Sequence, residues 1–295
     1  MEAARSTAAG IRRRVLEHVL ANGEGYLSQA CSSAEILAIL YTHILHFSPV
    51  AAAYKPGPFS GVPGPGRALA GAGRWPHGEV GPDFDRFIVS PAHYALPLYA
   101  ALIEVGRLAP SSLDQFNRDG STVEMIGAEH SPGFEVTTGS LAQGLSEAAG
   151  MALARRIRGD SGRVWVFLSD GEFEEGQTWE ALASASFYQL ANLRMVLDAN
   201  GRQCDGVISS VGKIEPLVER VRAFGVTVAE VDGHDLSALE QALSEAAPGP
   251  HLVIARTDPT RGLPVLADRR MLHTVRLSNA DERRAYEAAY QELLR

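Results

Sequence analysis

Two short polar motifs carry the residue types in this sequence that are best suited to chemistry. Asp170 lies one serine beyond the apolar run 164–168. Asn200 lies shortly after a second apolar run, 193–197. Both runs are typical of short buried strands, and the segment 177–190 between them is typical of a helix. The pattern predicts a β-α-β unit with Asp170 and Asn200 at the carboxyl ends of its strands, where parallel sheets bind ligands.

A carboxylate and a carboxamide at neighbouring strand ends suit a hard cation. Mg²⁺ prefers oxygen ligands and commonly takes one or two protein side chains together with phosphate oxygens. The alternative is that Asp170-Gly171 and Asn200-Gly201 are simple turns, because both pairs are turn formers. Their pairing on two strand ends favours a magnesium site that holds a diphosphate.

Three blocks of this sequence resemble the transketolase family. Residues 169–181, followed by 198–201, look like the family's thiamin-diphosphate motif, which has Gly-Asp-Gly, then Glu-Gly, then an asparagine. Residues 135–145 resemble its Thr-Gly-Ser-Leu-Gly-Gln-Gly block, and residues 85–93 resemble Asp-Arg-Phe-Val-Leu-Ser-x-Gly-His. The resemblance runs from about residue 11 to the end, apart from one segment rich in glycine and proline.

Helical patterns alternate with short strands along the chain, which indicates an α/β fold with a doubly wound, mostly parallel sheet flanked by helices. The resemblance implies the diphosphate-domain fold of thiamin-diphosphate enzymes, and we expect residues 1–295 to form one such domain. The further strands that we expect are 226–231 and 251–256. The expected helices are 11–22, 33–46, 94–106, 140–158, 177–190, 213–224, 235–247 and 280–294.

The segment 55–82 breaks this alternation. Gly and Pro fill 14 of its 28 positions, so it is unsuited to a helix or a central strand. It is longer than the corresponding link in transketolases, and we therefore predict an insertion at about 51–82. Two interpretations stay open, because loops of this length are either mobile surface loops or functional ones. The functional interpretation is a lid or a contact for a partner subunit.

Composition excludes several classes of protein. A net charge of −8 and a pI near 5.6 argue against a nucleic-acid or anionic-membrane partner. Two cysteines, Cys31 and Cys204, give neither a disulfide framework nor a cysteine-based metal cluster. No apolar run approaches the length of a membrane span. We therefore expect a cytoplasmic protein that acts on a small-molecule substrate, with no nucleic-acid and no membrane partner.

The resemblance implies a particular set of ligands for thiamin diphosphate and Mg²⁺. Asp170 and Asn200 would be the side-chain ligands of the metal, and the backbone carbonyl of Arg202 would be the third protein ligand. Gly171 would let the backbone approach the phosphates. The turn Gly139-Ser140 would open a helix whose N-terminal amides favour an anion.

Further cofactor contacts follow from the same resemblance. Leu141 would touch the cofactor's ring, and Glu172 belongs to the diphosphate motif. His93 matches the family histidine that contacts the diphosphate. His273 lies where the family has Trp-His, although the residues around it diverge.

The expected catalytic residues are His93, His273, Glu175 and Tyr26. Glu175 and Glu180 match family acids near the dimer interface that relay protons between sites, although exposed helix charges would look the same in sequence. His130 is a further histidine that could take part, although a lone histidine is more commonly a surface or core residue.

Two family histidines are absent. Tyr26 stands where the family has a Gly-His, and the stretch with Met125 and Ile126 stands where it has a Gly-His-Pro. Because those histidines handle ketose hydroxyls and protons, their absence argues against the ordinary sugar-phosphate substrate.

A full-length transketolase continues into a pyrimidine-binding domain, which we do not find in these 295 residues. The resemblance therefore implies the N-terminal subunit of a split, two-component transketolase-like transferase that moves a two-carbon ketol or acyl unit. Its partner would be a separate C-terminal subunit with the pyrimidine-binding domain, in an α2β2 heterotetramer. The alternatives are the α-subunit of a 2-oxo acid dehydrogenase or decarboxylase, and a non-catalytic regulatory homologue.

Overall fold

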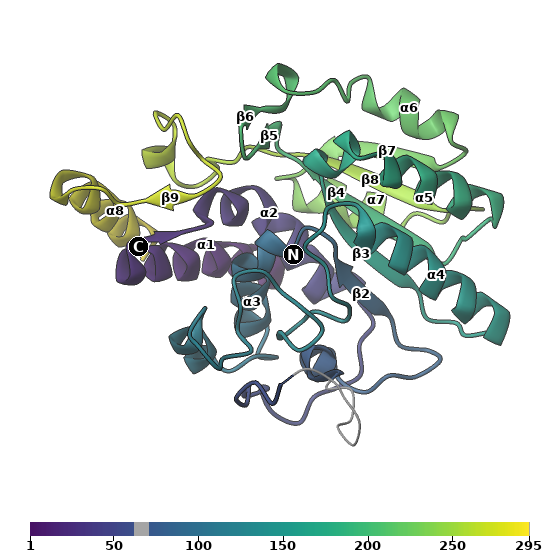
Figure 1. Ribbon diagram of the computed structural model, residues 1–295, viewed down its shortest axis with the longest axis horizontal. Coiled ribbons are helices and arrows are strands. Elements are labelled where there is room, and N and C mark those ends of the chain that lie inside the picture. The colour runs from purple at the N-terminus through teal and green to yellow at the C-terminus, as the bar shows by residue number, and fades with distance from the viewer. Residues whose placement is uncertain (62–70, 295) are drawn as a thin grey trace.

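A five-stranded parallel sheet forms the centre of the computed structural model, which describes residues 1–61 and 71–294 (Figure 1). The strands run in the order β2-β3-β4-β8-β7, and every neighbouring pair is parallel. Their bounds are Arg86–Val89 for β2, Val164–Ser169 for β3, Leu193–Ala199 for β4, His251–Arg256 for β8 and Thr227–Asp232 for β7.

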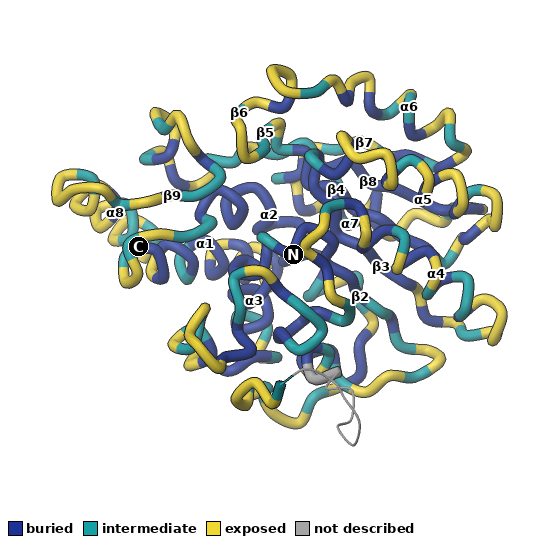
Figure 2. Tube along the Cα trace, viewed as in Figure 1, coloured by how far each residue is buried: buried dark blue, intermediate teal, exposed yellow. Residues whose placement is uncertain are grey.

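Helices cover both faces of this sheet. On β3, Trp165 and Phe167 belong to one core cluster, whereas Val164, Val166 and Leu168 belong to the other. This alternation follows from the two-residue period of a strand. Because both faces are covered, every residue of β3 and β4 is buried, as Figure 2 shows in dark blue, and such strands read as continuous apolar runs.

The helices divide between the two cores. The first core takes residues from α1 (Glu2–Asn22), α2 (Leu27–Ile39), α3 (Ala95–Glu104), α7 (Leu236–Ser244) and α8 (Ala280–Leu293). The second takes residues from α4 (Gln143–Arg158), α5 (Gly176–Phe187) and α6 (Leu217–Ala223). None of the helices in the described residues is both long and apolar enough to cross a membrane.

The predicted alternation of helices and strands is confirmed, with differences at the element ends. The first helix begins at Glu2 instead of residue 11, and α2 begins at Leu27 instead of residue 33 before a π-helical turn over Leu40–Ile44. The edge strand β2 was not expected, because its four residues lie inside a motif and are too few for a periodic pattern.

Two small sheets complete the strands. β1 (Glu24–Gly25) pairs antiparallel with β9 (Val275–Arg276), and β5 (Arg202–Gln203) pairs with β6 (Gly206–Val207). The first pair joins segments about 250 positions apart in sequence, so no local pattern predicts it. Both lie beside the carboxyl edge of the main sheet, in the loops that carry Tyr26, Arg202 and His273.

The glycine- and proline-rich insertion has a packed portion. Residues 62–70 lie outside the described part, but Gly71–His77 form a 3-10 helix with Pro76 inside it. Gly73 approaches a neighbouring loop so closely that an added Cβ would come 2.3 Å from the carbonyl oxygen of Phe134. His77 is buried and pairs through Nδ1 with Glu135 at 2.9 Å. Residues 71–77 therefore pack against the rest of the fold, and the mobile-loop, lid and partner-contact interpretations of the insertion stay predictions.

Candidate functional site

A pocket of about 490 Å³ lies at the carboxyl edge of the sheet. The loops that follow β2, β3, β4 and β8 contribute to its wall, together with the start of α2. Most residues that the sequence singled out line it: Tyr26, His93, Gly139, Leu141, Asp170, Gly171, Glu175, Asn200, Arg202 and His273. Two expected cofactor contacts, Ser140 and Glu172, lie outside the lining, as do Met125, His130 and Glu180.

Asp170 and Asn200 come together as the β-α-β pattern predicts. Each is the first residue after its strand, and the N–H of Gly201 donates to Oδ2 of Asp170 at 2.6 Å, which joins the two strand ends. Gly201 has a φ of 71°, a left-handed conformation that favours glycine. One metal ion could therefore reach both side chains.

The carboxyl of Asp170 lies in an environment that lacks positive charge. Asp170 is 2% exposed and forms no ion pair among the described residues. Burial raises the pKa of Asp170 well above its ordinary value, and the nearby Asp198 raises it further. A bound cation would reverse this effect, because a nearby positive charge favours the ionised carboxylate.

The carboxamide of Asn200 is held on both of its ends. Its Nδ2 donates to the hydroxyl of Tyr94 at 3.1 Å, and its Oδ1 accepts the N–H of Arg202 at 2.9 Å. The described residues form no group of three or more His, Cys, Asp or Glu side chains suited to a metal ion. The expected ligand set does not need one, because it consists of one carboxylate, one carboxamide and one backbone carbonyl.

Glu172 has a different position from the one expected. It is fully buried behind the pocket wall, where Oε1 accepts the Ser90 hydroxyl and the N–H of Ala142, and Oε2 accepts the N–H of Ser169 at 2.9 Å. Through these three hydrogen bonds, the carboxylate links the 139–142 turn to the ends of β2 and β3. We expected Glu172 to contact the cofactor directly, but in the structure this side chain instead holds the pocket loops together.

The 139–142 turn also differs from the expectation that Gly139-Ser140 opens a helix. Helix α4 begins at Gln143, after Ala142 in the left-handed region with a φ of 69°. Gly139 has a φ of 139°, which an L side chain rarely adopts, and lines the pocket. The backbone of this turn, rather than the end of a helix, faces the pocket.

Three rings in the pocket lining lie close together, and we call this part of the pocket its aromatic end. The ring centroids of His93 and His273 are 5.2 Å apart, and Tyr26 lies edge-on to His273 at 5.5 Å. Burial, and then the neighbouring His273, lower the pKa of His93 to about 3. Burial also lowers the pKa of His273 and raises that of Tyr26. All three rings are therefore neutral at pH 7.

Side chains from the start of α2 hold the loop that carries His273. The Ser28 hydroxyl donates to the carbonyl oxygen of Leu272 at 2.7 Å, and Nε2 of Gln29 donates to that of His273 at 3.0 Å. Ser28 and Gln29 line the pocket as well. Sequence reasoning missed both, because they contact a loop more than 240 positions away.

The remaining candidates divide between the pocket and the surface. Glu175 lies in the pocket lining, whereas Glu180 lines a separate groove between α4 and α5. His130 pairs with Glu124 at 2.9 Å and lies outside the lining. Ile126 also lines the pocket, and it belongs to the stretch where the resemblance implies a family histidine.

Comparisons with known proteins identify the family of this chain. The family described as "Transketolase, thiamine diphosphate binding domain" matches residues 74–290. The transketolase family protein y4mO of Sinorhizobium fredii is 37% identical over 90% of this chain and 88% of its own. The 6-deoxy-6-sulfo-D-fructose transketolase subunit SqwG of Clostridium sp. is 31% identical over 96% of this chain and 93% of its own.

A crystal structure of transketolase from Campylobacter jejuni has the same fold. It superposes with a TM-score of 0.79 and 23% identity, over 98% of this chain and 43% of that one. The chain thus spans less than half of that transketolase but most of y4mO and SqwG. It belongs to the transketolase family, and it contains that family's thiamine diphosphate binding domain.

Proposed function

We propose that this chain is the diphosphate-binding subunit of a transketolase-like enzyme that depends on thiamin diphosphate and Mg²⁺. The enzyme transfers a two-carbon ketol or acyl unit from a donor to an acceptor. The observation that carries the proposal is the meeting of Asp170 and Asn200 at one pocket edge, joined through the N–H of Gly201.

The residues at this edge fit a metal-bound diphosphate. Asp170 is a buried acid with no cationic partner among the described residues, so the fold leaves its charge for an incoming cation. A Cβ added at Gly171 would meet nothing closer than the Gln203 side chain at 3.8 Å, so the glycine leaves pocket space that a phosphate can occupy. Asp170, Asn200 and the carbonyl of Arg202 would hold Mg²⁺.

Bound thiamin diphosphate supplies the carbon centre that carries the transferred unit. The chain's own residues bind, orient and shield that centre. Burial keeps His93 and His273 neutral, and neither forms an ion pair among the described residues, so each imidazole can donate or accept a hydrogen bond with a substrate hydroxyl. Leu141 and Ile126 exclude water from the same space.

A separate subunit completes the enzyme in this proposal. The relative SqwG is named as a transketolase subunit and has nearly the same length as this chain, which supports a two-chain arrangement. The partner would supply the pyrimidine-binding domain, and two copies of each chain would form the heterotetramer.

The test of cofactor binding is calorimetric titration of thiamin diphosphate in the presence of Mg²⁺, on this chain mixed with its partner. Asp170→Ala should weaken binding by at least about 100-fold, because the diphosphate loses its bridge to the protein. Glu219→Ala is the matched control, since this exposed acid on α6 lies outside the pocket lining. Affinity like that of the wild type in Asp170→Ala would contradict the proposal.

The donor substrate should be less polar than an ordinary sugar phosphate. Tyr26 and Ile126 line the pocket where the family has histidines, and hydroxyls left without partners against such walls cost affinity. We expect weak turnover of xylulose 5-phosphate with ribose 5-phosphate. Turnover at ordinary transketolase rates would contradict this part, and CO₂ release from simple 2-oxo acids would favour a decarboxylase instead.

A further inference from the structure

The two ends of the Asn200 carboxamide have different surroundings. Its Nδ2 faces the buried hydroxyl of Tyr94 at 3.1 Å and Oδ2 of Asp198 at 3.5 Å, and both of these residues are at most 2% exposed. Its Oδ1 accepts one hydrogen bond, from the N–H of Arg202. A carbonyl oxygen has two lone pairs, so one remains for a ligand in the pocket.

The direction of these hydrogen bonds is determined by Asp198. The hydroxyl of Tyr94 has a single hydrogen, and it donates this hydrogen to Oδ2 of Asp198 at 2.9 Å. Toward Asn200 the same hydroxyl can therefore act only as an acceptor. The carboxamide must present its NH₂ group to Tyr94, and its oxygen must turn the other way.

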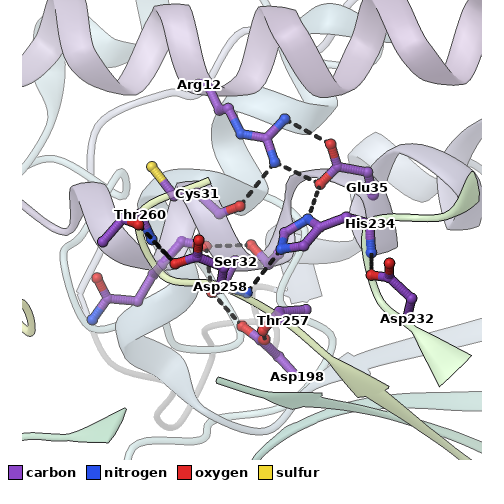
Figure 3. A network of polar contacts seen from close by, with 12 residues as sticks. Arg12, Cys31, Ser32, Glu35, Asp198, Asp232, His234, Thr257, Asp258 and Thr260 are labelled. Atoms are coloured by element: carbon purple, nitrogen blue, oxygen red, sulfur yellow. Dashed lines mark hydrogen bonds and ion pairs between the residues drawn. The ribbon is translucent and has the colours of Figure 1, made fainter. Parts of the chain in front are cut away.

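Asp198 cannot easily rotate, because hydroxyl donors hold both of its oxygens. Ser32 on α2 donates to Oδ2 at 2.5 Å, and Thr257 after β8 donates to Oδ1 at 2.5 Å. Figure 3 shows Ser32, Thr257 and Asp198 meeting at the sheet edge. Together with Tyr94, the carboxylate accepts three hydroxyl hydrogen bonds, so it acts purely as an acceptor.

The network continues away from the pocket and stiffens the loop that carries Thr257. The N–H of Asp258 donates to Nε2 of His234 at 2.8 Å, so the ring hydrogen sits on Nδ1, which faces Glu35 at 2.9 Å (Figure 3). Glu35 in turn pairs with Arg12 on α1. Helices α1 and α2 and the ends of β7 and β8 thus support the position of Asp198.

We propose that Tyr94 and Asp198 are positioning residues that fix which end of the Asn200 carboxamide faces the pocket. The two ends of a carboxamide are nearly the same size, and a flipped one would present N–H groups to a cation. The relay from Asp198 through Tyr94 to Asn200 excludes that orientation before any ligand binds. The part that concerns metal binding rests on the function proposed above.

Tyr94→Phe tests this proposal. It removes the hydroxyl but keeps the ring, which contacts Phe167 at a centroid distance of 5.0 Å. We expect the Mg²⁺-dependent affinity for thiamin diphosphate to fall about 5- to 10-fold, as the loss of one hydrogen bond at the site would cause. The loss is partial because the N–H of Arg202 favours the same orientation.

Tyr99→Phe is the matched control. Tyr99 is fully buried, and its hydroxyl donates to a backbone carbonyl oxygen, that of Glu124, away from Asn200. Both variants should lose a similar amount of stability in thermal unfolding, but Tyr99→Phe should keep the cofactor affinity within about twofold. Equal affinity loss in the two variants would overturn the proposal, because it would show a general effect of lost hydroxyls.

A double-mutant cycle separates orientation from other effects. In an Asn200→Asp background both terminal atoms are oxygens, so orientation no longer matters. Tyr94→Phe should then cause no further loss of affinity, and the same 5- to 10-fold loss there would overturn the proposal.

A readout without cofactor keeps the inference separate from the proposed function. Hydrogen exchange of the Asn200 side-chain NH₂, followed by NMR on the apo-protein, should be slow in the wild type and at least about tenfold faster in Tyr94→Phe. If the wild type bound no thiamin diphosphate while this difference held, the proposed function would fail and the positioning role would stand. Equal exchange in the two proteins would overturn the positioning role.

Discussion

The two ends of the pocket are built in different ways. At the metal end, Asp170 and Asn200 are held by named hydrogen bonds from backbone amides and from a buried polar network. At the aromatic end, Tyr26, His93 and His273 contact one another as rings, and neither histidine side chain has a hydrogen bond to another described residue. The functional atoms of the metal end are thus held by directional bonds, whereas the two imidazole rings of the aromatic end are held by packing.

Because of this difference, we expect the two ends to tolerate substitutions to different extents. Directional bonds hold oxygen atoms at fixed places, which a metal ion requires, and removing one partner leaves a buried polar group unsatisfied. Ring contacts tolerate volume-conserving changes more readily, because such changes in packing cost little. Cofactor binding should therefore tolerate a volume-conserving change at Tyr26 better than a change at Asp170 or Asn200.

The largest expected effect would break the metal end. Asp170→Asn should lower the Mg²⁺-dependent affinity for thiamin diphosphate at least about 100-fold, because the cation loses its charged ligand. The same change should raise the stability of the apo-protein by about 1 kcal/mol, because an uncompensated buried charge is removed. Calorimetry and urea denaturation measure the two quantities, and a loss of both affinity and stability would contradict this account.

The two ends should lose their contributions to stability over different ranges of pH as the protein is acidified. The folded-state pKa of His93 is about 3, below its ordinary 6.5, so the unfolded chain binds a proton that the folded chain does not. The contribution of His93 to the free energy of unfolding is complete above pH 6.5. It falls as the pH decreases toward 3, by at most about 1.4 kcal/mol per pH unit.

Glu35, in the network behind the metal end, acts in a lower window. Burial alone would raise its pKa, but hydrogen bonds from His234 and Arg12 lower it to about 2. The contribution of Glu35 to the free energy of unfolding is complete above pH 4.5 and is lost as the pH falls toward 2. His93→Gln should flatten the curve of unfolding free energy against pH between pH 6.5 and 3, whereas Glu35→Gln should flatten it only below pH 4.5. Identical curves for the two variants would contradict this distinction.

Sequence patterns predicted the part of the site that depends on local order. The apolar runs of β3 and β4 are continuous because helices cover both faces, so their ends, and with them Asp170 and Asn200, could be placed from sequence. Glu172 was misplaced, because a conserved-looking motif does not reveal whether a carboxylate faces a ligand or ties loops together, as this one does to Ser90 and Ala142.

The residues that sequence reasoning missed act over long separations. Tyr94 reaches Asp198 across 104 positions, and Ser32 reaches it across 166. One local signal was available, since Asp198 is the one acidic residue of the buried strand β4, and a buried carboxylate requires hydrogen-bond donors. The identity of those donors depends on the tertiary fold, which no periodicity encodes.

The smallest expected effect concerns the aromatic end. Tyr26→Phe removes the side-chain hydrogen bond between Tyr26 and Thr274 but keeps the ring that lies edge-on to His273 at 5.5 Å. The bond is partly accessible to water, so its loss should lower the free energy of unfolding by about 0.5 to 1 kcal/mol. The Mg²⁺-dependent affinity for thiamin diphosphate should stay within about twofold of the wild type, because no bond at Asp170 or Asn200 changes. A loss of affinity as large as that expected for Tyr94→Phe would show that the two ends are coupled and that packing, too, positions the metal ligands.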